Sequence, residues 1–372
     1  MINIYELAFS KIYGIGPKTA LNVLNYVGSP ENLFSLDRKE LQHIFKTRER
    51  TINDIINKTM FARCEKELQF IEKFNLRAYF VTNNAYPRRL KNIPDAPLCL
   101  FIDGRGDLES KRIVSIVGSR RATDYGIWAT ERIVETLKQY DVVTVSGLAY
   151  GIDSASHRAS LKYDIPTFAV LGHGLDMVYP REHYSLAQQL KERGGLVSEF
   201  FTQTAVSPHT FPMRNRIIAG LSDLVIVVES AKKGGSLITA RLANDYNRDV
   251  MAVPGRITDK FSEGCNFLIE SSRAHILSSP SSISRLMGWQ KEEKDVFKPL
   301  NENPVPEVNS RESTLGKKQS LIYSVLSKRG ETDIDTLSVE TGISISELSA
   351  FLLELELEDF VVAKPGKVYK AI

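Results

Sequence analysis

Residues 112–255 repeat one pattern, in which a short apolar run is followed by a turn and then by an amphipathic helix. Six runs have the composition of strands: 112–118, 141–147, 166–172, 195–200, 223–230 and 249–255. Four of them end in glycine, and their near-continuous Val and Ile residues favour strands buried on both faces of a parallel sheet. This alternation predicts an α/β fold with a Rossmann-like, doubly wound, mostly parallel sheet.

The regions on either side have different patterns. Residues 1–75 contain short helical patterns, and residues 287–315 contain three prolines and no helical period. Residues 316–372 contain three helical patterns followed by "VVAKPGKVYKA", which is typical of a β-hairpin. We therefore predict four segments: a helical domain (1–75), the Rossmann-like core (76–286), a flexible linker (287–315) and a winged-helix domain (316–372).

Charge and cysteine content narrow the classes of partner and compartment. The chain of 372 residues has a formal net charge of +3, which divides into +2, +5, −2 and −2 over the four predicted segments. A polyanion is therefore expected to bind the first two segments. The three cysteines are far apart, which favours a reducing compartment, and no apolar run is long enough to span a bilayer. These features predict a cytoplasmic protein without a metal site.

The turns after the strands carry the candidate binding residues. Glycines and free helix N-termini form phosphate-binding nests, which hydroxyls and cations complete. Because parallel strands end at one edge of the sheet, these turns are expected to share one rim. The candidates are Gly118, Ser119, Arg120, Arg121, Gly147, Gly151, Lys232, Lys233, Gly234, Gly235 and Ser236, together with Arg214, Asn215 and Arg216 at the start of an apolar helix.

Several nests along one rim could hold more phosphates than the two of a dinucleotide, which points to a nucleic-acid backbone. Tyr125, Tyr150, Tyr179 and Phe211 are candidates for stacking with bases. Asp153 is either a ligand-binding residue or a helix cap. Four further arginines are interpreted as solvated helix residues: Arg132, Arg158, Arg241 and Arg248.

The N-terminal run "KIYGIGPKTALNVLNYVG" resembles a helix-hairpin-helix module. In such modules, hairpin amides and a nearby lysine or threonine contact DNA phosphates without reading bases. The candidate contacts are Gly14, Gly16, Lys18 and Thr19. The alternative is that this turn serves only packing, and the sequence leaves both interpretations open.

Together these motifs resemble the DNA-processing protein A family (DprA, also called Smf). The resemblance rests on ordered runs that include "IVGSRRATDYG", "VSGLAYGIDSASHRASL", "FPMRNRIIAGLSD" and "VVESAKKGGSLITARLA". It implies binding of single-stranded DNA, dimerisation and loading of RecA recombinase during natural transformation. It also implies a basic pocket at Gly118–Arg121 and Gly234–Ser236, with Lys232 or Lys233 as a further cation.

Sequence-independent binding of single-stranded DNA is therefore the leading interpretation, without catalysis and without a cofactor. The chain has no G-x-x-x-x-G-K-[ST] run and no nucleophile elbow. The alternative is an enzyme resembling the Rossmann-like nucleotide phosphoribohydrolases, which need a glutamate after a glycine-rich turn. The corresponding turn here, "KKGGSLITAR", lacks that glutamate. A dinucleotide-dependent oxidoreductase ranks last, because Arg120 and Arg121 stand where glycines are required.

Overall fold

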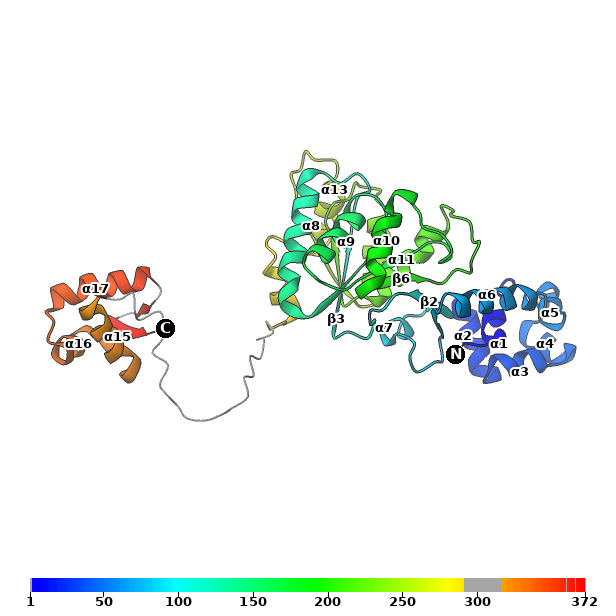
Figure 1. Ribbon diagram of the computed structural model, residues 1–372, viewed down its shortest axis with the longest axis horizontal. Coiled ribbons are helices and arrows are strands. Elements are labelled where there is room, and N and C mark those ends of the chain that lie inside the picture. The colour runs from blue at the N-terminus through cyan, green and yellow to red at the C-terminus, as the bar shows by residue number, and fades with distance from the viewer. Residues whose placement is uncertain (1, 291–315, 359, 365, 372) are drawn as a thin grey trace. The chain divides into compact units, whose positions relative to one another are not determined.

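The computed structural model describes residues 2–290, 316–358, 360–364 and 366–371 (Figure 1). The chain divides into two compact units, Met1–Lys294 and Asp295–Ile372. Of the predicted linker 287–315, residues 291–315 lie outside the described residues. The proposed boundary between a helical domain at 1–75 and a core at 76–286 stays a prediction.

The first unit contains a nine-stranded mixed sheet. Its strands are β1 (Arg77–Phe80), β2 (Cys99–Asp103), β3 (Arg112–Val117), β4 (Val142–Ser146), β5 (Thr167–Val170), β6 (Gly195–Ser198), β7 (Leu224–Val227), β8 (Asp249–Ala252) and β9 (His275–Ile276). The order across the sheet is β1-β2-β6-β5-β4-β3-β7-β8-β9. All neighbours from β6 to β9 pair in parallel, whereas β2 is antiparallel to both β1 and β6.

This topology confirms the predicted mostly parallel sheet, since β3 to β8 fall within the six predicted runs. Strands β1, β2 and β9 were not predicted from the sequence, because they lie outside the repeat of strand, turn and helix. Along the chain, β4, β5 and β6 are added one after another on one side of β3. The next strand, β7, pairs with the other side of β3. The carboxyl ends of β3 and β7 therefore form the switch point at which open α/β sheets bind ligands.

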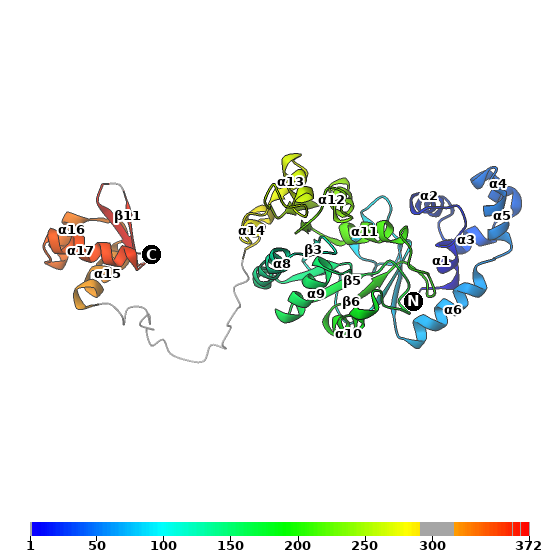
Figure 2. The ribbon, with the colours of Figure 1, turned by 90° about the horizontal axis from the view of Figure 1, so that it is seen from above.

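Helices cover both faces of the sheet (Figure 2). They are α7 (Arg88–Lys91), α8 (Asp124–Leu137), α9 (Ile152–Lys162), α10 (Tyr184–Arg193), α11 (Thr210–Leu221), α12 (Ser236–Asp245), α13 (Glu263–Glu270) and α14 (Ser282–Met287), with 3-10 turns η1 (Lys138–Tyr140) and η2 (Arg181–His183). Alternate residues of β3 enter two different cores. Val114 and Ile116 pack in the core that includes residues of α8, whereas Ile113 and Val117 pack in the core that includes α11.

Six short helices precede the sheet: α1 (Ile4–Phe9), α2 (Pro17–Val27), α3 (Pro30–Ser35), α4 (Arg38–Phe45), α5 (Glu49–Ile56) and α6 (Phe61–Lys73). Their apolar residues, such as Leu7 and Ile52, belong to the same hydrophobic core as Phe101 of β2. Buried Glu67 of α6 also accepts hydrogen bonds from the backbone N–H and the hydroxyl of Thr202. The helices and the sheet are therefore packed together in one unit.

The second unit has the elements of a winged helix, as predicted. Its elements are α15 (Lys317–Arg329), β10 (Thr332–Asp333), α16 (Ile334–Thr341), α17 (Ile345–Leu357), β11 (Val361–Lys364) and β12 (Val368–Ala371), and β12 lies between the other two strands. Ile322, Leu337, Leu352 and Val361 join in a core of their own. No helix among the residues described in either unit is long and apolar enough to cross a membrane.

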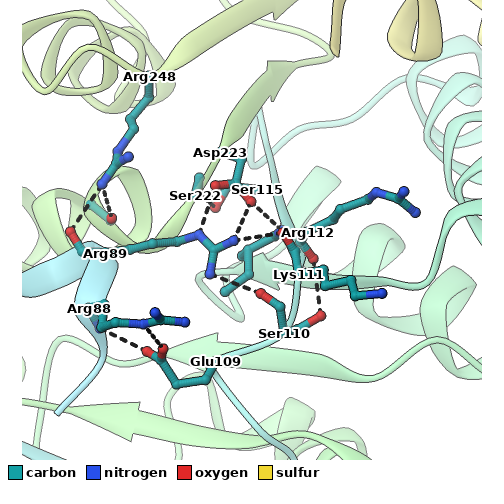
Figure 3. A network of polar contacts seen from close by, with 12 residues as sticks. Arg88, Arg89, Glu109, Ser110, Lys111, Arg112, Ser115, Ser222, Asp223 and Arg248 are labelled. Atoms are coloured by element: carbon teal, nitrogen blue, oxygen red, sulfur yellow. Dashed lines mark hydrogen bonds and ion pairs between the residues drawn. The ribbon is translucent and has the colours of Figure 1, made fainter. Parts of the chain in front are cut away.

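An arginine-rich network ties the amino ends of β3 and β7 together (Figure 3). Arg89 donates from Nε and Nη2 to the two carboxylate oxygens of Asp223, each at 2.8 Å. Its guanidinium also donates to the carbonyls of Ser110 and Lys111, both at 2.9 Å. Asp223 in turn accepts a hydrogen bond from the backbone N–H of Ile113 at 2.8 Å. The Arg89–Asp223 ion pair therefore links the amino ends of β3 and β7.

Two more arginines belong to this amino-end network, which we define as Arg88, Arg89, Glu109, Asp223 and Arg248. Arg88 pairs with Glu109 at 2.6 Å. Arg248 donates to the carbonyls of Arg89 and Gly220 at 3.0 and 3.2 Å. The prediction that Arg248 is a solvated helix residue is therefore wrong. Arg248 follows the end of α12 and precedes β8, and from there its guanidinium reaches a carbonyl of α7 and a carbonyl of α11.

Candidate functional site

A pocket of about 460 Å³ lies at the carboxyl ends of β3 and β7. Four segments line this rim pocket: the turn after β3 (Gly118–Arg120), the turn after β4 with the start of α9 (Ala149 and Asp153), the start of α11 with the loop before it (Pro208, Phe211, Pro212, Arg214 and Asn215), and the turn after β7 (Ser230, Ala231 and Gly234–Ser236). A smaller recess of about 60 Å³ shares Arg120 and Arg214 with it and adds Tyr150 and Tyr179. The structure thus brings together loops from widely separated parts of the chain.

The turn after β3 is held in place by the start of α9. The backbone N–H of Ile152 donates to the carbonyl of Ser119 at 3.1 Å, and Ser119 Oγ accepts the N–H of Arg121 at 3.0 Å. Gly151 has φ +76°, and a Cβ atom there would lie 2.1 Å from the Ser119 carbonyl oxygen. Gly151 therefore permits close packing of two turns, and it does not itself line the pocket.

Four cations stand at or beside the rim pocket, and we call Arg120, Arg121, Lys232 and Lys233 the rim cations. All four side chains are exposed. Among the residues that the structure describes, none of them forms an ion pair or a side-chain hydrogen bond. Arg120 lies over the ring of Phe211, with 4.9 Å between its guanidinium carbon and the ring centroid. Their charge is therefore available to a ligand.

Arg214 and Asp153 form the buried wall of the rim pocket. Arg214 is only 5% exposed, and its Nη1 lies 3.8 Å from Asp153 Oδ2. Gly147 makes room for this guanidinium, since a Cβ atom at that position would lie 1.5 Å from Nη1. Burial raises the pKa of Asp153, an effect that the Arg214 cation opposes. Burial likewise lowers the pKa of Arg214, and Asp153 opposes that change.

The position of Asp153 decides between the two interpretations left open by the sequence. The N-cap residue of α9 is Gly151, and no side chain caps that helix. Asp153 instead accepts the backbone N–H of Ala149 at 3.3 Å and lines the rim pocket. It is thus a pocket residue, not a helix cap.

Arg216 does not reach the rim pocket. Its guanidinium binds the carboxylate of Glu199 and donates to the carbonyl of Asp95 at 2.7 Å. Residues two apart on a helix do not share a face, so Arg214 and Arg216 point to different surroundings. The neighbouring Asn215 does line the pocket.

The turn after β7 is shaped by hydrogen bonds of its own. Ser236 Oγ donates to Ser230 Oγ at 2.9 Å, and the N–H of Gly234 donates to the carbonyl of Ala231 at 2.9 Å. Gly234, Gly235 and Ser236 line the rim pocket, as the sequence predicted for this turn, whereas Lys232 and Lys233 stand outside its lining.

A second pocket, of about 790 Å³, lies beside this turn and was not predicted from the sequence. It contains Tyr125, Arg256 and Lys260, so Tyr125 does not join the other predicted aromatic residues. Glu229 lies between the pocket and the start of α8, where it accepts the N–H and the hydroxyl of Thr123 at 2.9 and 2.5 Å. The only sequence signal for this pocket was the Pro-Gly turn after β8, followed by two cations.

The N-terminal hairpin has the geometry of its motif. Gly14 has φ +73°, and Gly16 is the N-cap of α2, with no atom within 4 Å of a Cβ built on it. Lys18 and Thr19 are exposed on the first turn of α2. These four residues stay candidates for a phosphate contact.

The fold and the rim pocket define a class of protein: a Rossmann-like α/β protein with an accessible cationic pocket at its switch point. Three family models match the chain. They are DNA recombination-mediator protein A over residues 77–288, the DprA winged helix domain over 309–367, and a SAM-like helix-hairpin-helix tandem over 6–58.

Relatives and solved structures agree with these matches. The chain is 32% identical to Protein Smf of Synechocystis sp. over 98% of each chain. It superposes with a TM-score of 0.68 and 33% identity on the X-ray structure of DNA processing protein A from Streptococcus pneumoniae, covering 78% of this chain and 99% of that one. A structure of DNA processing protein A from Helicobacter pylori, described for its single-stranded DNA binding mode, matches with a TM-score of 0.53 and 27% identity, covering 58% and 98%.

The chain therefore belongs to the DprA/Smf family of DNA-processing proteins. This is a family of recombination mediators that are generally not enzymes.

Proposed function

We propose that this protein binds single-stranded DNA at the rim pocket, without reading an extended sequence, and acts as a recombination mediator. The observation that carries the proposal is the set of rim cations, which are exposed at the switch point of the sheet and form no ion pair among the described residues. Such an arrangement suits a chain of phosphates. The Helicobacter pylori relative, with its single-stranded DNA binding mode, supports the same ligand class.

Each part of the site has a distinct task in this proposal. Gly118, Ser119 and the Gly234–Ser236 turn offer polar groups to the backbone phosphates, and the rim cations neutralise their charge. Phe211, which lies under Arg120, and the exposed rings of Tyr150 and Tyr179 accept bases by stacking. Stacking tolerates any base, so this contact does not read a sequence.

Membership of the family supports a proposal for the wider role. We propose that the protein acts in the cytoplasm as a homodimer, protects incoming single strands in natural transformation and loads RecA recombinase onto them. Two grooves in a dimer would hold one strand with increased effective concentration. Gly14, Gly16, Lys18 and Thr19 are a candidate second DNA contact.

The chemistry of the rim pocket argues against the alternative nucleotide hydrolase. A phosphoribohydrolase needs a carboxylate free to act on the substrate. The one acidic residue among the pocket-lining residues is Asp153, which already faces Arg214.

The test is fluorescence anisotropy with a labelled oligothymidine at a series of salt concentrations. We expect a log–log slope of affinity against salt of about −2 to −3, since each phosphate contact contributes about −0.7. Arg120→Ala should weaken binding about tenfold, reduce the slope by about 0.7 and leave the Tm unchanged. Lys232→Ala and Lys233→Ala, measured separately, show which lysine contacts DNA.

The matched control is Arg132→Ala. Arg132 is an exposed arginine on α8 that pairs with Glu135, away from the rim pocket. It should leave affinity unchanged. A salt response that is flat, or an Arg120→Ala protein that binds like the wild type, would refute the phosphate clamp.

A further inference from the structure

Arg214 is a buried cation that forms no hydrogen bond within the part of the chain that the structure describes. Among the described residues it makes only the 3.8 Å approach to Asp153, and its buried Nε atom has no acceptor. Buried guanidinium groups almost always have their donors satisfied, because an unpaired buried donor costs free energy. Arg216, two residues away and equally buried, shows the usual case with two acceptors. The buried wall of the rim pocket therefore has N–H donors of the Arg214 guanidinium that a ligand could accept from.

The charge of Asp153 restricts what that ligand is. A phosphate placed against Arg214 would also lie near the Asp153 carboxylate, and the two anions would repel each other. The carboxylate already balances the charge of the guanidinium. A neutral group fits this wall better, provided that it has a hydrogen-bond acceptor for Arg214 and a donor for Asp153.

The rest of the pocket suits a flat ring. Its volume of about 460 Å³ exceeds that of a nucleobase, and Phe211 lines it with Arg120 lying over the phenyl ring. A base that stacks against these groups would turn its polar edge toward the buried wall. The rim cations would remain free for the phosphates on either side of that nucleotide.

We propose that the Asp153–Arg214 pair selects keto nucleobases, thymine and guanine, at one position of the bound strand. This inference rests on the proposed function, binding of single-stranded DNA, and refines it. The ring N–H of thymine or guanine donates to the Asp153 carboxylate, and the adjacent carbonyl accepts from Arg214. Cytosine and adenine have the opposite pattern, with a ring-nitrogen lone pair facing the carboxylate and an amine facing the guanidinium.

The experiment compares two labelled 12-mers that differ only in this edge, oligothymidine and oligo(5-methyl-deoxycytidine), at neutral pH and equal salt. Both bases are 5-methylpyrimidines, so the methyl contact is held constant. We expect the wild-type protein to bind oligothymidine at least about fivefold more tightly. Asp153→Asn should shrink or reverse this ratio, because an amide can donate to the cytosine ring nitrogen. Whichever of Lys232→Ala and Lys233→Ala weakens DNA binding should weaken binding to both strands equally and keep the ratio.

The outcomes separate the two levels of the proposal. Equal, tight binding of both strands by the wild-type protein overturns the keto selection and leaves single-stranded DNA binding standing. Absence of binding to either strand refutes the proposed function itself. Should Asp153→Asn fail to fold, the wild-type ratio alone decides, and Arg214→Gln is the second variant in which the ratio should fall toward one.

Discussion

The two ends of the parallel strands use arginine in opposite ways. At the amino ends, Arg89 donates to both oxygens of Asp223 and to two backbone carbonyls. At the carboxyl ends, the rim cations have no ion pair among the described residues, and Arg214 has no hydrogen bond. A guanidinium that is fully paired stabilises the fold, whereas one that is left unpaired is available to a ligand. The difference separates structural from functional cations more clearly than residue type does.

The largest effect should follow from breaking the amino-end network. Arg89→Ala leaves Asp223, whose side chain is 26% exposed, without its cation and frees two carbonyls. We expect a loss of about 3 kcal/mol in the free energy of unfolding, measured by urea denaturation, because removing one partner of a largely buried pair leaves an uncompensated charge. DNA affinity of the folded protein should not change.

The adjacent arginine is the control for this variant. Arg88 pairs with Glu109, but its own side chain is 81% exposed. Arg88→Ala should therefore change stability by less than about 1 kcal/mol. If Arg89→Ala instead weakened DNA binding without loss of stability, the division between the two ends would be wrong.

The second largest effect is expected at acidic pH, where a buried histidine of α9 should lower the stability of the protein. His157 of α9 is fully buried, and its Nδ1 lies 2.8 Å from Thr167 Oγ1. Burial, with smaller effects of His183 and Arg214, lowers the pKa of His157 to about 3. Below pH 6.5, therefore, His157 binds a proton in the unfolded chain but stays neutral in the folded protein. This contribution to stability is present above pH 6.5 and is lost as the pH falls toward 3.

One such group lowers the free energy of unfolding by up to about 1.4 kcal/mol for each pH unit of acidification, or by about 2 kcal/mol between pH 6.5 and 5. His157→Asn should flatten the dependence of Tm on pH in this window. His209→Asn, at an exposed histidine, should leave the dependence unchanged. Parallel pH profiles of the wild-type and His157→Asn proteins would show that this group does not control acid stability.

The smallest effect is expected from removing the winged helix. Its third helix, α17, carries exposed acidic residues at Glu347 and Glu354, and Glu358 follows it. These charges oppose a phosphate backbone, so deletion of residues 316–372 should change the affinity for oligothymidine by less than about twofold. A fall of tenfold or more would show that this unit shares in DNA binding.

Local sequence patterns predicted much of the fold. The six runs of the repeat became β3 to β8, because alternating strand and helix segments leave a parallel sheet as the way to bury both faces. Strands β1 and β9 could not be predicted, since both lie outside the repeat of strand, turn and helix, and β9 has only two residues.

The individual roles in the candidate site were harder to predict. Gly147 and Gly151 stay candidate ligand-binding glycines, and the structure adds that they make room for Arg214 and for the Ser119 carbonyl. Gly147 also lines the smaller recess beside the rim pocket. Arg214 and Arg216 looked equivalent in the sequence, and only one of them lines the pocket. Such differences depend on neighbours that are distant along the chain.

The sequence by itself determined that glycine-rich turns and cations would gather at one edge of a parallel sheet, because parallel strands all end on the same side. Only the tertiary structure decided which cations are satisfied. Arg89 meets Asp223 across 134 residues, and Arg214 is placed beside Asp153 from a different element of the fold. Whether a charge finds its partner depends on the packing of these distant elements, and no local pattern in the sequence records that packing.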